Sequence, residues 1–161
     1  MRPIADCCPD HWRLVNDDVM GGCSISRVQA TPVGTILFSG EVSLANRGGF
    51  ASMRINTRLL DLNSDDELVA KVRGDGRSYL LNLYSRGAPT GFSHRAAFET
   101  VAGEWLEARF RVADFKATRF GVPVPAPRAA QAIPVVSLGV MIADGAAGPF
   151  SLELAGIWIV P

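Results

Sequence analysis

The stretch that decides the fold class runs from residue 35 to residue 44 and reads TILFSGEVSL. Apolar side chains return at alternate positions, at Ile36 and Phe38 and again at Val42 and Leu44, and most positions between them are polar. Successive side chains of a β-strand point to opposite faces, so this alternation predicts a strand with one face buried and the other in water.

The same alternation recurs in five later segments, each short and bounded by turn residues. These segments cover residues 68–72, 79–83, 106–112, 136–142 and 150–154. Helix-compatible sequence is brief, around residues 128–132, where we expect a loop with one helical turn. Many strands with almost no helix need two packed layers to cover their apolar faces. The sequence therefore predicts an all-β, antiparallel β-sandwich of jelly-roll type.

Length and composition indicate one globular domain over residues 1–161. Hydrophobic residues make up 48% and charged residues 20% of the chain, and no linker or internal repeat divides it. No apolar run approaches the roughly 20 residues that span a bilayer, and the first six residues do not resemble a secretory signal. We therefore expect a cytoplasmic protein without a membrane span.

The charge balance gives little reason to expect a nucleic-acid partner. Sixteen basic and sixteen acidic residues cancel, so no net field attracts nucleic acid or an anionic membrane. Only Lys71 and Lys116 are lysines, which leaves fourteen arginines among the sixteen basic residues. Arginine suits planar, bidentate or stacked contacts, but this bias alone names no ligand.

The residue types that carry metal chemistry and catalysis are scarce. Cys7, Cys8 and Cys23 are odd in number, and together with His11 they lack the paired spacing of a zinc site, so reduced thiols and no metal are expected. No nucleophile elbow or phosphate-binding glycine motif is present, and His94, like His11, lies outside any catalytic motif. The sequence favours a protein that is not an enzyme and needs no cofactor.

A first glycine-rich segment, residues 16–24, reads NDDVMGGCS and is the most unusual in the chain. Its acidic and amide side chains can bond nearby backbone, and two glycines permit a close backbone approach. It is either a binding loop, with calcium on Asp17 and Asp18 as one form, or a hydrogen-bonded turn before a strand. Calcium needs six to eight oxygens, so the turn is favoured.

Two further segments combine glycine with polar side chains. Residues 48–54 read GGFASMR and place Phe50, Ser52 and Arg54 on one side of a strand, where they either contact a ligand or form an edge of the core. Residues 73–79 contain Asp75 and Gly76, and this pair predicts a tight hairpin between neighbouring antiparallel strands.

In this order, the segments resemble the complex I intermediate-associated protein 30 family, whose domain adopts a galactose-binding-like jelly roll. The resemblance implies an assembly factor, since mitochondrial members hold membrane-subunit intermediates of the respiratory NADH:ubiquinone oxidoreductase. It implies a protein partner and no catalytic residues. The matching stretches are Trp12 with residues 16–24, then 38–40, 48–54, 73–79, 97–100, 103–105, 114–115 and 148–154.

We expect the three glycine-containing segments to converge, either as a binding surface or as a structural lock in which Asp17 or Asp75 pairs with Arg54 or Arg73. Tyr79 is expected to be exposed within that patch. The candidate binding residues are Asp17, Met20, Ser24, Arg54, Arg73, Asp75 and Tyr79.

Two alternatives to a protein-binding factor remain open. One is a carbohydrate-binding module that uses Tyr79, Tyr84 or Trp105 as a stacking platform. The other is an enzyme with a carboxylate, Asp17 or Asp75, tuned by a neighbouring arginine. Strand-like positions also predict a set of buried residues, namely Trp12, Phe38, Phe50, Phe98, Phe110, Phe150 and Leu152.

Overall fold

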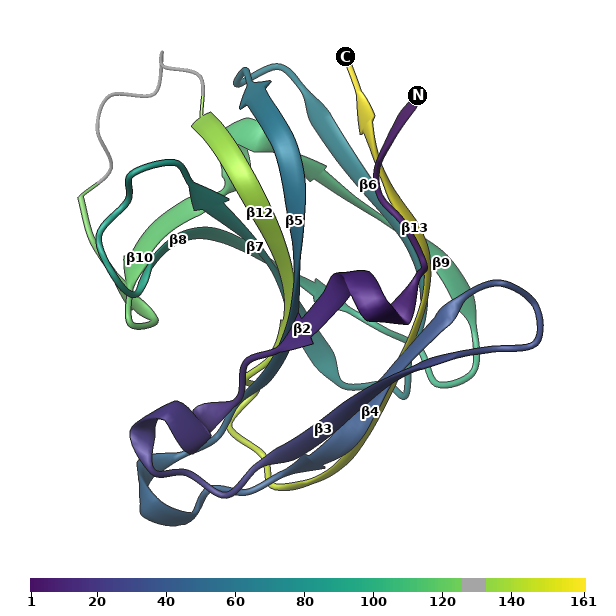
Figure 1. The fold of residues 1–161 in the computed structure, drawn as a ribbon, viewed down its shortest axis with the longest axis vertical. Helices are drawn as coiled ribbons and strands as arrows, with labels where there is room; N and C mark the ends of the chain where they lie inside the picture. The colour runs from purple at the N-terminus through teal and green to yellow at the C-terminus, as the bar shows by residue number, and fades with distance from the viewer. Residues whose placement is uncertain (126–132) are drawn as a thin grey trace.

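Two antiparallel sheets face each other in the computed structural model, which describes residues 1–125 and 133–161 (Figure 1). The helical turn expected at residues 128–132 lies outside the described residues. The strands are β1 Arg2–Ala5, β2 Trp12–Leu14, β3 Ile25–Ala30, β4 Ile36–Val42, β5 Ala51–Leu62, β6 Glu67–Arg73, β7 Ser78–Ser85, β8 Phe92–Glu99, β9 Trp105–Arg111, β10 Lys116–Arg119, β11 Val122–Pro123, β12 Ile133–Ile142 and β13 Gly148–Val160. Short 3₁₀ helices are η1 Pro9–His11, η2 Asp17–Met20, η3 Ala45–Arg47 and η4 Val112–Asp114.

The sheets differ in size and in which strands they contain. One follows the order β3-β4-β13-β6-β9, with β1 also paired to β13, and the other follows β11-β10-β8-β7-β12-β5-β2. The pairing of β1 with β13 brings the first and last strands side by side (Figure 1). This arrangement confirms the predicted all-β sandwich of jelly-roll type.

Alternating strand residues fill the space between the sheets, as the sequence pattern predicts. Phe38 on β4 and Phe150 on β13 pack with ring centroids 4.9 Å apart, and Phe98 on β8 lies 5.7 Å from Phe110 on β9. All the residues expected in the core are buried except Phe50, which is half-buried. Phe50 precedes β5 and lies on the outer side of the seven-stranded sheet, where the other sheet does not cover it.

The predicted hairpin at Asp75-Gly76 is wrong. Gly76 does adopt the positive φ that the sequence suggested, at 91°, but β6 and β7 belong to different sheets. The turn carries the chain across the sandwich. Both Asp75 carboxylate oxygens fix this crossover, because Oδ2 accepts a hydrogen bond from the Ser151 N–H at 2.9 Å and Oδ1 lies 3.0 Å from the Tyr79 hydroxyl.

No helix in residues 1–125 and 133–161 has the length and apolar character needed to cross a bilayer.

Candidate functional site

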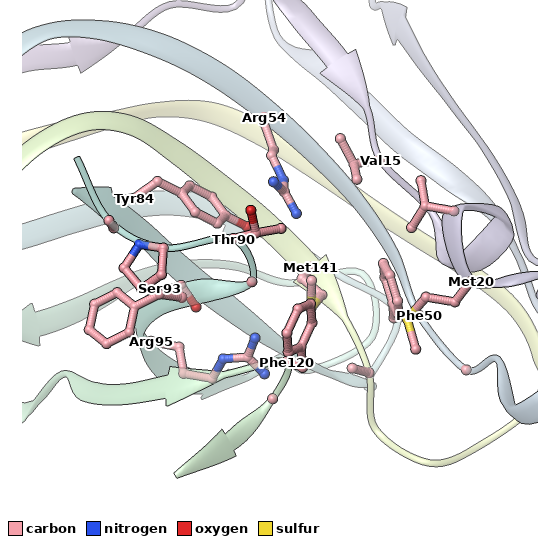
Figure 2. Close-up of a pocket in the computed structure, with 18 of the residues that line it drawn as sticks. Val15, Met20, Phe50, Arg54, Tyr84, Thr90, Ser93, Arg95, Phe120 and Met141 are labelled. Atoms are coloured by element: carbon pink, nitrogen blue, oxygen red, sulfur yellow. The ribbon is translucent and has the colours of Figure 1, made fainter. Parts of the chain in front are cut away.

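A groove of about 880 Å³ runs over the outer face of the seven-stranded sheet (Figure 2). Its floor comes from β5, β12, β7 and β8, one rim comes from η2 and the other comes from the turn after β10. A cavity of this size lies within the range of small-molecule sites, so the groove is the candidate functional site.

Strand register places the charged side chains of the floor. Gly139 on β12 pairs with Arg54 on one side and with Asn82 on the other, and Asn82 in turn pairs with Arg95 on β8. Paired residues of neighbouring strands share a face of the sheet. The two arginines therefore project from the same face, and the two positions between them are Gly139, which has no side chain, and Asn82.

Gly139 leaves room for an arginine to stack on a tyrosine. A Cβ at this position would lie 2.9 Å from the ring of Tyr84 and 3.4 Å from Cγ of Arg54. Because Gly139 has no Cβ, the Arg54 guanidinium lies 4.3 Å from the centre of the Tyr84 ring, in cation–π geometry. The stack holds the Arg54 side chain across β12, where it faces into the groove.

The groove floor is positively charged. Neither Arg54 nor Arg95 makes an ion pair within the part of the chain that the structure describes, and Nε of each is buried without a hydrogen-bond partner. Burial lowers the pKa of Arg95, and repulsion from Arg54 acts in the same direction. Burial raises the pKa of Tyr84 from its ordinary value, so its hydroxyl stays protonated at neutral pH.

Large apolar side chains stand at the two rims. Met20 on η2 is 59% exposed, and Phe120 in the turn after β10 is 65% exposed. Phe120 has a φ of 49°, an uncommon conformation for a bulky residue, and its ring packs against Gly91 of the β7–β8 loop. Figure 2 shows Met20 beside Phe50, and Phe120 between them and Arg95. The groove thus joins a cationic floor to apolar rims.

A buried carboxylate fixes the rim that carries Met20. Asp17 is fully buried, and its oxygens accept hydrogen bonds from the Ser24 N–H at 2.9 Å, the Ser24 hydroxyl at 2.6 Å and the Gly49 N–H at 2.7 Å. The Phe50 N–H adds a longer bond at 3.3 Å. Burial by itself would raise the pKa of Asp17, but these bonds outweigh it and hold the pKa below its ordinary value.

Gly22 of the first glycine-containing segment and Gly48 of the second leave space for the Asp17 carboxylate. A Cβ on Gly48 would lie 2.5 Å from Asp17 Oδ2, and a Cβ on Gly22 would overlap the same side chain. Asp18, in contrast, is exposed. The donors around Asp17 are N–H and O–H groups rather than the oxygen ligands that calcium requires. The segment is the hydrogen-bonded turn that the sequence favoured, and it acts as a lock between η2 and the start of β5.

The third segment belongs to a separate network along β13. The Arg73 guanidinium pairs with Glu153 at 2.6 Å, and Arg77 binds both oxygens of Asp144 at 2.6 and 2.9 Å. Hydrogen bonding to Asp144 raises the pKa of Arg77. Among the described residues, no hydrogen bond joins this network to the lock around Asp17.

Two expectations about the candidate patch are therefore wrong, and one is correct in part. Asp17 and Asp75 accept hydrogen bonds from backbone N–H and hydroxyl groups and do not pair with Arg54 or Arg73 in the described ranges. Convergence holds for the first two segments alone. Tyr79 is 1% exposed, because it shares the inward face of β7 with the core leucines.

Of the seven candidate residues, the groove contains Met20 and Arg54. Asp17 and Ser24 lie behind it in the lock, and Arg73, Asp75 and Tyr79 lie in the β13 network. Sequence reasoning did not single out Ser93, Arg95 and Phe120 as site residues, and it named Tyr84 only as a sugar platform. Polar residues such as Ser93 and Arg95 are common on the outer face of a strand, so the sequence alone does not mark them as site residues. The strand register is needed to show that they lie in the groove.

The three aromatic residues proposed as a sugar platform do not lie together. Tyr79 is buried, and Trp105 is on β9 of the other sheet, where the Arg73 guanidinium lies 5.2 Å from its ring centre. Tyr84 lines the groove, but Arg54 covers one face of its ring.

Comparisons with known proteins agree on one family and one fold. A family model described as Complex I intermediate-associated protein 30 (CIA30) matches residues 6–154. "Complex I intermediate-associated protein 30, mitochondrial" of Drosophila melanogaster is 28% identical over an aligned stretch of 167 residues, gaps included. The alignment covers 90% of this chain and 56% of the fly protein. The chain thus spans just over half the length of that relative.

Solved structures with this fold include carbohydrate-binding modules. The family 11 module from Clostridium thermocellum, in complex with a β-1,3-1,4-mixed-linked tetrasaccharide, superposes with a TM-score of 0.62 at 13% identity, covering 96% of this chain and 95% of the module. The family 29 module from Piromyces equi gives a TM-score of 0.57 at 8% identity, covering 99% and 87%. At these identities the likeness shows the galactose-binding-like jelly-roll fold.

Proposed function

Because the chain belongs to the complex I intermediate-associated protein 30 family, we propose that it is a non-enzymatic assembly factor that holds a partner protein in the groove over its seven-stranded sheet. The partner would be an assembly intermediate of a respiratory complex, as the name of the fly relative suggests for that protein. This chain would keep the intermediate from premature contacts until the next subunit arrives.

The observation that carries this proposal is the pair of exposed apolar rims. Met20 on η2 and Phe120 after β10 both line the groove and are more than half exposed, and neighbouring Val19 is 70% exposed. Large apolar side chains that gather on an exposed surface are typical of protein-interaction sites. The lock around Asp17 fixes one rim, so the surface is formed before the partner binds.

The composition of the groove supports binding rather than catalysis. Within the described residues, its lining contains no Asp, Glu, His, Cys or Lys. General acid–base catalysis uses a group that exchanges a proton near neutral pH, whereas arginine stays protonated. The groove therefore offers contacts and fixed positive charge.

Native affinity purification of the tagged chain from its own organism, read by quantitative mass spectrometry, tests this proposal. We expect subunits of a respiratory complex to be enriched with the wild-type chain and lost with Met20→Asp or Phe120→Asp. Val33→Asp is the matched control, because Val33 is 77% exposed in the β3–β4 turn and does not line the groove. A chain that repeatedly emerges alone, or rim variants that capture the same subunits, would contradict the proposal.

A carbohydrate-binding module is the second candidate, favoured by a groove large enough for a sugar and by a similar structure that holds a tetrasaccharide. A glycan array followed by calorimetry tests it. Binding of a neutral oligosaccharide that is abolished by Tyr84→Ala would favour this candidate over the assembly factor.

A further inference from the structure

Arg54 and Arg95 in the groove lack the acidic partner that Arg77, another half-buried arginine of the described residues, has. Arg77 is withdrawn from water, but its guanidinium is held by both oxygens of Asp144. Arg54 and Arg95 are partly buried and make no ion pair in residues 1–125 and 133–161. Residues 126–132 read APRAAQA and contain no carboxylate that could serve. No acidic side chain of the described residues therefore pairs with either guanidinium, and residues 126–132 contain none.

We propose that the groove floor binds a carboxylate through Arg54 and Arg95, and that this carboxylate is an acidic side chain on a polypeptide segment of the partner. The inference rests on the proposed function, because it names the chemistry by which the partner is recognised. Charges withdrawn from water are costly without a partner, and the planar guanidinium fits a carboxylate through two parallel hydrogen bonds.

Both arginine side chains reach the same groove, one from β5 and the other from β8. Figure 2 shows their guanidinium groups reaching into the groove from opposite sides. Arg54 is held by its stack on Tyr84, so it loses little freedom when a ligand binds. The Tyr84 hydroxyl remains protonated, and Thr90 also lines the groove, so neutral hydroxyl donors accompany the two cations.

The apolar rims favour a polypeptide over a sugar acid or a free phosphate. A small anion would cover the arginines and leave Met20 and Phe120 in water. An acidic residue flanked by apolar residues would cover the cations and both rims together, with its apolar side chains against Met20, Phe50 and Phe120. Phe120 adopts a left-handed backbone conformation, and its ring packs on Gly91 while the residue remains 65% exposed.

Selection from a random peptide display library tests this inference on the full chain. The wild-type chain is the target, and the Arg54→Gln/Arg95→Gln variant is the counter-target. We expect the selected peptides to be enriched in Asp or Glu beside Leu, Phe or Met. Their synthetic forms, titrated by fluorescence anisotropy, should bind roughly tenfold or more weakly when either arginine becomes Gln, and equally weakly when the acidic residue becomes its amide.

Matched variants separate recognition from folding. Arg111→Gln removes an exposed arginine from β9 of the opposite sheet and should leave peptide affinity unchanged. Arg54→Lys keeps the positive charge but loses the planar guanidinium that donates two parallel hydrogen bonds. This variant should bind the peptides with intermediate affinity. If Arg54→Gln does not fold, Arg95→Gln and the amide peptide on the wild-type chain still decide the question.

Several results would overturn the inference. These are selected peptides without acidic enrichment, no binders at all, affinities unchanged in the arginine variants, or tighter arginine-dependent binding of oligogalacturonate or inorganic phosphate than of any peptide. Native capture distinguishes this failure from that of the proposed function. Subunits captured equally by wild type and Arg54→Gln/Arg95→Gln would leave the assembly role standing without the carboxylate site. Acidic peptides that bind through the arginines, with no native partner captured, would leave the carboxylate site standing without the assembly role.

Discussion

The lock around Asp17 and the floor under Arg95 are neighbouring regions that treat charge in opposite ways. Asp17 is a buried anion with backbone and hydroxyl donors on both oxygens. Arg95 is a partly buried cation whose Nε has no partner in the described chain. The contrast teaches that the satisfied charge holds the scaffold together and the unsatisfied charge is available to a ligand. If this division is correct, removal of the Asp17 carboxylate destabilises the folded chain, whereas removal of the Arg95 charge does not.

Asp17→Ala should produce the largest loss of stability, about 3 kcal/mol or more in the free energy of unfolding. The change leaves several buried donors without an acceptor, and each such group costs about 1–3 kcal/mol. Chemical denaturation measures it. Asp18→Ala removes the adjacent exposed carboxylate and should stay within about 0.5 kcal/mol of wild type. Equal effects of the two changes would show that the lock is not structural.

Gly48→Ala should cost about 1–3 kcal/mol, because its Cβ would lie 2.5 Å from Asp17 Oδ2. Repeating the substitution in an Asp17→Ala chain provides the control. In that chain the Asp17 carboxylate is gone, so Gly48→Ala should lower the free energy of unfolding clearly less than it does in wild type. A cost that is identical in both backgrounds would place the strain somewhere other than the lock.

The lock should also make stability depend on pH in the acid range. The pKa of Asp17 is lowered in the folded chain, so the carboxylate contributes stability above the unfolded value near 3.9, and this contribution is lost as pH falls through the folded pKa. Comparison of wild type with Asp17→Ala should therefore show a stability difference that shrinks below about pH 4. A difference that stays constant down to pH 2 would contradict the ionised lock.

Arg95→Met should leave the free energy of unfolding unchanged or raise it by up to about 1 kcal/mol. Burial lowers the pKa of Arg95, so the charged guanidinium favours the unfolded chain, while Met keeps an apolar stem against the sheet. Thermal and chemical denaturation measure the change, with peptide binding recorded in parallel. A loss of more than 2 kcal/mol would mean that Arg95 belongs to the scaffold.

The smallest effect on stability is expected at the rim. Met20→Ala removes a side chain that is 59% exposed and should shift the free energy of unfolding by no more than about 0.5 kcal/mol, while partner capture falls. Capture that falls only in proportion to a loss of folded protein would remove Met20 from the binding surface.

The strands and the fold class could be predicted from the sequence because alternation is a local property. Ile36 and Phe38 show which face of a strand is buried, and they are fully buried. Alternation does not show which sheet a strand joins. The Asp75-Gly76 turn therefore looked like a hairpin, although β6 and β7 join different sheets and Asp75 bonds Ser151, far along the chain.

The candidate site was only partly predictable for a related physical reason. Glycine marks places where backbone and side chain come close, so it directed attention to Asp17 and Gly48, which proved to be the lock. The groove floor depends instead on the register of β5, β12, β7 and β8, which sets Arg54 near Arg95. A short segment does not show how its strand is aligned with a strand far away in the sequence, and no local sequence pattern marks the outer-face arginines.

The pairing of β1 with β13 has a consequence for engineering. Arg2 is opposite Ile159, so both ends of the chain leave the sandwich at the same place, away from η2 (Figure 1). A domain with adjacent ends can be inserted into a host protein through a single surface loop, or circularly permuted with a short linker between the old ends. The exposed β3–β4 turn at Val33 offers a place for the new ends. The groove could then be displayed on a carrier of choice with both of its rims unobstructed.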